Sequence, residues 1–533
     1  VRRRRRRKGQ KKMSILHELP QIVKRAGEEC DRLLRCAEEE IAKKKKTEVS
    51  FFAEAAAGTG TVSSSDEPEE GSRSFPVSDE SEDCSGRFFL CDNARFLAEK
   101  IADGSLVQAV DLIYIDPPFY SQTEQGVRIE IKSPICDAKV VGRLSAYSDI
   151  WENDRSSYLE VIAVRLMLMK ETLKPTGSIF VHLDWHAVHA VKLIMDEIFG
   201  EQNFINEIIW TYKSGGSASR HYSRKHDTIL FYSRTRQYKF RLQKEKSYNR
   251  GLRPYRFKGV EEFQDDIGWY TMVNQKDVWN IDMVGRSSGE RLSYATQKPE
   301  ALLARIIDAV TDEGDLTADF FCGSGTLAAV AAQKNRRFVC TDISSLAVAN
   351  ALKRPLQAGY PVCLSLLSSS PEICDRPAAL DSVSSAAAGG VFLASDAAVR
   401  GSKKKENRIE AGRRDGTFEL QNYIPNFQNP ALRIKEENDR KNWRKIVKKD
   451  PLSLIYYWGV GTLTKKGEFF PKAVSFRKKD GSLNRELHLD IISEVTVPSA
   501  EEDRRCVKRD EKRKLFIFAA DIFGNIVFSE PAE

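Results

Sequence analysis

Apolar and polar positions between residues 87 and 355 fall into two blocks that predict alternating strands and helices. In the first block, "RFFLCD" predicts a strand, "NARFLAEKIADG" a helix and "DLIYIDPPF" a second strand. The order strand, helix, strand is typical of a βαβ unit and therefore of a parallel sheet. The block continues with a helix at "YLEVIAVRLMLMKETLKPTG", a strand at "SIFVHLD" and a helix at "HAVHAVKLIMDEIFG".

The second block begins at "TQKPEALLARIIDAVTDEGD", which predicts a helix that ends at Gly314. The following "LTADFFCGSGTLAAVAAQKNRRFVCTDIS" has the pattern of a strand, a glycine turn, a helix and another strand. Between the two blocks, "HDTILFY" predicts one more core strand. The whole pattern indicates an α/β domain.

The regions around these blocks have different compositions. Residues 15–46 carry apolar positions at helical spacing, a Ser/Glu-rich segment follows them, and runs such as "LIYYWGVGTL" near the C-terminus predict strands. We therefore expect five units: a basic tail with N-terminal helices (1–47), a disordered linker (48–86), the α/β domain (87–365), a low-complexity linker (366–415) and a separate β-rich domain (416–533).

The net charge of +8 over 533 residues comes from the N-terminal tail. Residues 1–12 carry nine basic side chains, so the rest of the chain sums to 8 − 9 = −1. The tail is either an electrostatic arm for a polyanion or sequence read through ahead of a start at Met13, and we favour the second interpretation.

Apolar runs and cysteines indicate the class of protein. No apolar run reaches the roughly 18 residues that span a bilayer, and no secretory signal pattern is present, which predicts a cytoplasmic protein without membrane contact. The ten cysteines form no CxxC pair, and Cys322 and Cys340 lie in apolar runs, so we expect reduced, buried thiols.

The "DPPF" segment at the end of the second predicted strand is the first candidate for chemistry. An acid before two prolines can simply cap a turn. Here Asp116 ends a buried parallel strand, at the sheet edge where open α/β folds bind ligands. Asp116 and the Pro117 carbonyl would form two fixed acceptors for an exocyclic amine, Pro118 would stiffen the loop, and Phe119 would stack on a flat base.

The glycine turn "DFFCGSGT" is the second candidate. One such turn is weak support for a ligand, because tight turns need glycine for structural reasons alone. Asp342, at the end of the next predicted strand, is placed to accept hydrogen bonds from both hydroxyls of a ribose. The spacing and the missing third glycine fit a nucleoside cofactor without pyrophosphate better than NAD.

Together these segments resemble the amino-group DNA methyltransferases that use S-adenosylmethionine (AdoMet). The order of "DPPF", "TQKPEALLARII" and "FCGSG" is similar to that of the circularly permuted β class, which includes modification subunits of type III restriction systems. The resemblance covers roughly residues 87 to 355. It implies a Rossmann-like AdoMet-dependent methyltransferase domain with permuted motif order and a target-recognition region at 205–290.

The resemblance also implies a role for individual residues. The catalytic motif would be Asp116, Pro117, Pro118 and Phe119. The residues that would bind AdoMet are Asp92, Lys298, Asp319, Phe321, Gly323, Gly325 and Asp342. Cys91 departs from the glycine more usual before the acid at position 92. No metal is required for this transfer, so the three histidines His182, His186 and His189 are expected to have structural or polar roles.

A basic, aromatic-rich stretch lies inside the predicted recognition region. Residues 208–259 contain fourteen Lys or Arg against two acids, together with ten aromatic residues. The candidates for phosphate contacts are Lys213, Arg220, Arg224 and Lys225. A solvated face with ordinary packing aromatics is the simpler alternative.

We therefore expect a site-specific methyltransferase that acts on the N6 amine of adenine in double-stranded DNA, in restriction-modification or alone. Methylation of cytosine N4 is an alternative, because the same acceptors suit either amine. A second alternative is a catalytically silent DNA-binding specificity or scaffold subunit. A restriction subunit and a second copy of the chain are the further partners that the resemblance suggests.

Overall fold

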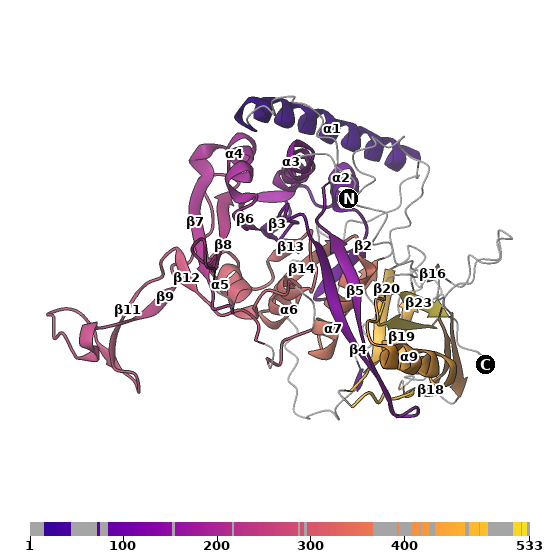
Figure 1. Ribbon diagram of the computed structural model, residues 1–533. Coiled ribbons are helices and arrows are strands. Elements are labelled where there is room, and N and C mark those ends of the chain that lie inside the picture. Colours follow the sequence, from indigo (N-terminus) through magenta and orange to yellow (C-terminus); the bar gives the residue numbers. More distant parts are fainter. Residues whose placement is uncertain are drawn as a thin grey trace, which may run out of the picture.

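The computed structural model describes most of the chain, and Figure 1 shows its arrangement. The described residues are 15–43, 72–74, 84–151, 155–215, 218–285, 288–292, 296–365, 392–393, 408–414, 417–425, 432–463, 468–478, 480–488, 515–523 and 525–529. The tail at 1–12 and most of both predicted linkers lie outside these residues. Among the described helices, none is long and apolar enough to cross a membrane.

A single sheet of 15 strands among the described residues organises the molecule. Its central strands are β2 (Gly86–Leu90), β3 (Val110–Ile115), β6 (Leu173–Leu183), β7 (Phe204–Thr211), β8 (His226–Ser233), β13 (Leu316–Asp319), β14 (Arg337–Asp342) and β15 (Val362–Ser365). They lie in the order β7-β8-β6-β3-β13-β14-β2-β15. The strands from β6 to β15 run parallel, and β8 is antiparallel to both of its neighbours.

Helices cover both faces of this sheet, as Figure 1 shows. One layer contains α1 (Ile15–Lys43), α2 (Asn93–Ala102), α3 (Arg155–Thr172) and α4 (Val188–Phe199), and the other contains α5 (Glu300–Val310), α6 (Thr326–Gln333) and α7 (Ser345–Gln357). Strand β3 alternates between the layers: Ile113 and Ile115 pack on the first, and Leu112 and Tyr114 on the second. This confirms the predicted Rossmann-like α/β core.

The functional motifs meet where the sheet changes its winding direction. The chain passes from β13 to β14 through α6, and from β3 to β6 through α3 in the opposite direction across the sheet. Adjacent strands β13 and β3 therefore form the switch point, where open α/β sheets bind ligands at the carboxyl ends of their strands. Strand β3 precedes β13 in the chain, which is the predicted permuted order.

A target-recognition region was predicted at 205–290, and part of this segment projects from the core as an arm in Figure 1. The arm is built from β9 (Lys244–Tyr248), β10 (Phe263–Gln264) and β11 (Trp269–Asn274), which form their own sheet. Strand β12 (Val278–Asn280) brings the chain back to the main sheet beside β7.

The C-terminal strands correct the expectation of a separate β-rich domain. Strand β20 (Glu468–Phe476) pairs with β15, and β19 (Ile455–Leu463), β22 (Leu515–Asp521), β23 (Ile526–Ser529) and β16 (Phe392–Leu393) continue the same sheet. A second sheet of β17 (Arg408–Arg414), β18 (Thr417–Ile424) and β21 (Glu486–His488) packs beside them. A strand's own periodicity predicts that it pairs, but does not predict with which edge.

Two other expectations need correction. Strand β1 (Ser72–Ser74), which pairs with β20, lies inside the predicted linker 48–86. Strand β17 lies inside the predicted linker 366–415. Several elements were not predicted, among them β7, β15, α7, the long hairpin of β4 (Glu124–Ser133) and β5 (Ala138–Ser148), and helix α9 (Glu437–Lys449). The hairpin is inserted between the "DPPF" motif and α3.

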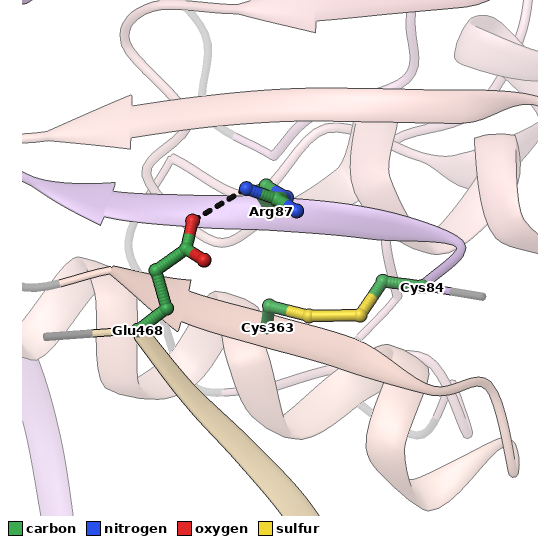
Figure 2. Close-up of a disulfide and its surroundings, with 4 residues drawn as sticks. All are labelled: Cys84, Arg87, Cys363 and Glu468. Atoms are coloured by element: carbon green, nitrogen blue, oxygen red, sulfur yellow. Dashed lines mark hydrogen bonds and ion pairs between the residues drawn. A yellow bond between two sulfur atoms is a disulfide. The ribbon is translucent and has the colours of Figure 1, made fainter. Parts of the chain in front are cut away.

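A disulfide links β15 to the residues just before β2, and it contradicts the prediction that the cysteines are all reduced. Figure 2 shows the Cys84–Cys363 bond, which joins positions 279 residues apart. Across β15, Arg87 Nη1 on β2 donates to Glu468 Oε1 on β20 at 2.5 Å, so a largely buried ion pair also ties the C-terminal strands to β2. Cys322 and Cys340 are free and buried, as expected.

Candidate active site

Asp116 follows β3 directly and presents one unpaired oxygen. Its Oδ2 atom accepts a hydrogen bond from Lys298 Nζ, which comes from the loop before α5. Its Oδ1 atom is buried and accepts no hydrogen bond within the described part of the chain. A buried carboxylate oxygen without a donor is unfavourable, so Oδ1 is the acceptor in this site that a ligand N–H would satisfy.

The loop after Asp116 is held in an uncommon backbone conformation. Tyr120 and Gln122 have φ angles of 64° and 57°, in a backbone region that residues other than glycine seldom adopt. The buried carboxylate of Asp149 accepts hydrogen bonds from Tyr120 N at 3.1 Å and from both N and Oγ of Ser121 at 2.6 Å. It also accepts from Trp151 Nε1 at 3.0 Å. Four donors on one carboxylate fix the shape of this loop.

The two prolines and Phe119 are supported from other elements. Tyr158 on α3 donates its hydroxyl to the Pro118 carbonyl at 2.8 Å, which leaves that carbonyl engaged. The Phe119 ring stacks on His182 with 6.1 Å between centroids and 18° between planes, and Lys298 Nζ lies 5.4 Å from its centroid. The ring is therefore positioned by the sheet beneath it.

His182 is part of a buried polar chain. Its Nδ1 atom lies 2.9 Å from the Tyr114 hydroxyl, and its Nε2 atom lies 3.2 Å from Asp227 Oδ2. Tyr212 donates to the other Asp227 oxygen at 3.1 Å. Burial acts to raise the pKa of Asp227, but the hydrogen bonds from His182 and Tyr212 and the positive charges of His182 and Lys298 together lower it. No cluster of three or more metal-binding side chains occurs among the described residues.

The glycine loop joins β13 to α6 at the neighbouring strand end. Gly325 has a φ of 71°, and a Cβ at this position would lie 2.6 Å from the Cβ of Ala351 on α7. Glycine is therefore required there both by the backbone and by close packing of a helix. Gly323 N donates to Asp342 Oδ2 at 2.9 Å, so the loop and the acid after β14 form one unit.

The acids around this loop lie in a low-dielectric environment. Burial raises the pKa of Asp342 to about 6, opposed by hydrogen bonds from the backbone N–H groups of Ser344 and Gly323. Burial also raises the pKa of Asp319 well above its ordinary value, and the negative charges of Asp116 and Asp342 add to this effect. Phe321 N donates to Asp319 Oδ1 at 3.0 Å, so the predicted cofactor residues of this loop lie together.

Two predicted cofactor residues form ion pairs with other side chains of the protein. Lys298 pairs with Asp116, as described above. Asp92 is the N-cap of α2, where Oδ1 accepts from Ala94 N at 3.0 Å and Arg95 N at 3.1 Å. Its Oδ2 atom accepts from Arg165 at 2.8 Å. A role for Asp92 toward adenine stays a prediction.

The predicted DNA-binding residues lie on the segment between β7 and β8. Lys213, Arg220 and Arg224 are exposed. Lys225 instead donates to the Ser214 carbonyl and hydroxyl at 2.7 and 2.8 Å and to the Gly215 carbonyl at 3.0 Å, which closes the segment on itself. Since Lys225 is engaged in this way, its predicted phosphate contact has the least support of the four.

The structure adds Trp185 and Asp149 to the site, and sequence reasoning missed both. Trp185 follows β6, the neighbour of β3, and remains 45% exposed. The Arg224 guanidinium lies 4.0 Å from its ring centroid, which brings the basic segment to the edge of the sheet where Asp116 lies. The exposed aromatic in "HLDWH" was the available signal for Trp185, whereas nothing local distinguished Asp149.

Comparison with known proteins agrees with this geometry. Residues 110–353 match the N6/N4 family model that is described as DNA methylase, and this span includes both Asp116 and the glycine loop. The chain contains an amino-group DNA methyltransferase domain. Methyltransferases of this family use AdoMet as methyl donor, as predicted.

Curated relatives are type II methyltransferases. The chain is 26% identical over 271 residues to M.HpaI of Haemophilus parainfluenzae, covering 50% of this chain and 73% of the relative. It is 26% identical over 251 residues to M2.DpnII of Streptococcus pneumoniae, covering 46% and 82%. These matches confirm the predicted amino-group methyltransferase, and the similarity to type III modification subunits stays a prediction.

Solved structures give weak global matches. The M1.HpyAVI–SAM complex is 16% identical with a TM-score of 0.32, covering 50% of this chain and 98% of that one. The PvuII DNA methyltransferase, which is cytosine-N4-specific, is 14% identical with a TM-score of 0.34, covering 52% and 97%.

Proposed function

We propose that this protein transfers a methyl group from AdoMet to the N6 amine of an adenine flipped out of duplex DNA, in restriction-modification or as a solitary enzyme. The observation that carries the proposal is the buried Oδ1 atom of Asp116, an acceptor without a donor. A flipped adenine offers an exocyclic amine with two protons, the type of donor that this oxygen lacks.

Each residue of the site has its own role in the proposed transfer. Asp116 Oδ1 accepts one amine proton in a hydrogen bond, and the adjacent Pro117 carbonyl is the expected acceptor for the second. Both bonds favour a more tetrahedral nitrogen whose lone pair is available for attack. Lys298 fixes the other Asp116 oxygen, and Phe119 offsets part of the few kcal/mol that unstacking the base costs.

The polar groups around the cofactor loop suit the ribose and methionine parts of AdoMet. Bound AdoMet supplies an electrophilic methyl group on a sulfonium. Each Asp342 oxygen accepts one backbone N–H bond, which leaves lone pairs for the ribose hydroxyls. Gly323 and Gly325 keep the backbone open toward the ligand, and the buried Asp319 carboxylate lies where a cationic amine of the methionine part would be favourable.

Adenine is preferred over cytosine because aspartate rather than serine precedes the two prolines. Duplex DNA is the proposed substrate, with Lys213, Arg220 and Arg224 at its backbone. The Arg224–Trp185 contact supports this arrangement, since it holds the basic segment beside the catalytic strand ends. A cytoplasmic location and association with a restriction subunit or a second copy belong to the same proposal.

The test is incubation of the purified protein with duplex DNA and isotope-labelled AdoMet, followed by mass spectrometry of nucleosides. Label in N6-methyladenine, lost in Asp116→Ala and kept in Asp137→Asn, is the expected result, because Asp137 is an exposed carboxylate in the nearby hairpin. DNA binding by Asp116→Ala should stay close to wild type. Label in N4-methylcytosine would show that the target base is cytosine. DNA binding without any label would support a scaffold subunit.

A further inference from the structure

Helix α9 carries a stripe of positive charge that the active site does not explain. The stripe consists of six exposed cations: Arg440, Lys441, Arg444, Lys445, Lys448 and Lys449. Their spacing of one and four residues puts them all on one side of the helix. Residues of the opposite side, Trp443, Ile446 and Val447, pack into the core of the C-terminal region.

The stripe has few acidic neighbours. Arg440 pairs with Glu437 at 3.5 Å, and Lys445 Nζ donates to the Cys136 carbonyl at 2.6 Å. In the part of the chain that the structure describes, Lys441, Arg444, Lys448 and Lys449 have no carboxylate within 4.0 Å. Like charges four residues apart repel each other on a helix, so the stripe opposes helix formation unless an anionic partner neutralises it.

The position of α9 connects the stripe to the active site. Asn442 Nδ2 donates to the Lys139 carbonyl at 3.0 Å, and Lys445 reaches Cys136, so α9 is fixed to the far end of the β4–β5 hairpin. The near end of that hairpin starts five residues after Phe119, and Figure 1 shows β4 and β5 running from the core to α9. A ten-residue strand spans about 33 Å. This is the length of roughly ten base pairs, or one turn of duplex DNA.

We infer that the α9 stripe binds the phosphate backbone of duplex DNA about one helical turn away from the methylated base. The inference rests on the proposed function, which puts duplex DNA at Asp116, and assigns the C-terminal region a part in holding it. A membrane surface is the other large polyanion. It fits less well, because an interfacial helix inserts a free apolar side into lipid, and the apolar side of α9 is already packed against protein.

The experiment measures how the affinity for a random-sequence 40-base-pair duplex depends on salt, by fluorescence anisotropy of labelled DNA. The test variant is Arg444→Glu with Lys448→Glu, and the matched control is Lys24→Glu with Arg35→Glu, which reverses two exposed cations on α1. Losing two phosphate contacts should lower the slope of log affinity against log salt by about 1.8. The control should keep the wild-type slope.

A neutral variant and lipid vesicles complete the test. Arg444→Gln with Lys448→Gln removes the same contacts without introducing new charge, so its slope should fall equally while its melting temperature reports the fold. An unchanged slope in this variant, or an equal fall in the α1 control, would overturn the inference. The inference would also be overturned if this variant kept its DNA affinity but lost binding to vesicles that contain anionic lipid.

The outcome for the stripe is separate from the outcome for the proposed function. Anisotropy needs no turnover: a slope that depends on α9 with no methyl transfer by the wild type would reject only the function. Normal methyl transfer with a slope independent of α9 would reject only the stripe.

Discussion

Replacement of Asp149 by asparagine tests whether the loop after the catalytic motif is positioned by one carboxylate. All four of its partners are donors: Tyr120 N, Trp151 Nε1, and the N and Oγ atoms of Ser121. An asparagine oxygen can keep two of these bonds, and the Ser121 hydroxyl can rotate to accept from the new amide. At least the Ser121 N–H then faces another donor in a buried position.

The expected size of the effect follows from this loss. An unsatisfied buried N–H costs about 1–3 kcal/mol, and the loss of a charged acceptor adds to it. Tyr120 and Gln122 each store about 1 kcal/mol in their left-handed conformations, so the loop relaxes once Asp149 no longer holds it. If the loss raises the activation free energy of methyl transfer by about 2–3 kcal/mol, kcat falls by roughly 30- to 150-fold.

The assay is methyl transfer in a single turnover on plasmid DNA, with binding of AdoMet and DNA measured separately. Both affinities should stay within about twofold of wild type, because Asp149 is buried and its oxygens are engaged by donors of Tyr120, Ser121 and Trp151. The exposed Asp137, at the other end of the same hairpin, supplies the control substitution Asp137→Asn, which should leave the rate unchanged. A rate for Asp149→Asn within about threefold of wild type, in a folded protein, would refute this reasoning.

Two further predictions concern the cofactor loop. Gly325→Ala forces a side chain into a φ of 71° and against Ala351, so calorimetry should show a lower melting temperature and titration a weakened affinity for AdoMet, by at least about tenfold. Burial raises the pKa of Asp342 to about 6, so the stability from this group is present below its ordinary pKa near 3.8 and is lost as pH rises through about 6. AdoMet affinity, which needs the ionised acceptor, should change the opposite way and fall as pH drops through about 6, and titration of Asp342→Asn should show weaker binding without this pH dependence.

The sequence predicted six of the eight central strands, all except β7 and β15, because each of the six contains a short apolar run. It also placed Asp116 and the glycine loop at one sheet edge, since both follow strands of a parallel sheet. The hairpin was missed although Val127, Ile129 and Ile131 alternate with polar positions. Its apolar side packs on residues about three hundred positions later, and no local pattern indicates such a partner.

The contacts of the site were less predictable than its motifs. Lys298 was assigned to the cofactor because it lies in "TQKP", but its partner in the structure is Asp116, 182 residues earlier in the chain. The role of Asp149 depends on donors from a loop 28 residues away, which only the closed hairpin brings within reach. Side chains so far apart in the chain meet only because of how the strands pair and in which register. The local residue pattern does not predict that register.

The same hairpin explains why the C-terminal region is part of the enzyme rather than an appendage. At its base, Asp149 holds the loop that carries Phe119. At its tip, Ser133 donates to the buried carboxylate of Asp450 at 2.6 Å, so the hairpin is fixed to the C-terminal region by a polar contact that excludes water. Because β20 pairs with the edge strand β15, β3 and the C-terminal strands belong to one sheet. The hairpin forms a separate two-stranded sheet whose apolar side packs into the C-terminal core. A duplex bound along α9 would therefore lie in a fixed orientation relative to Asp116.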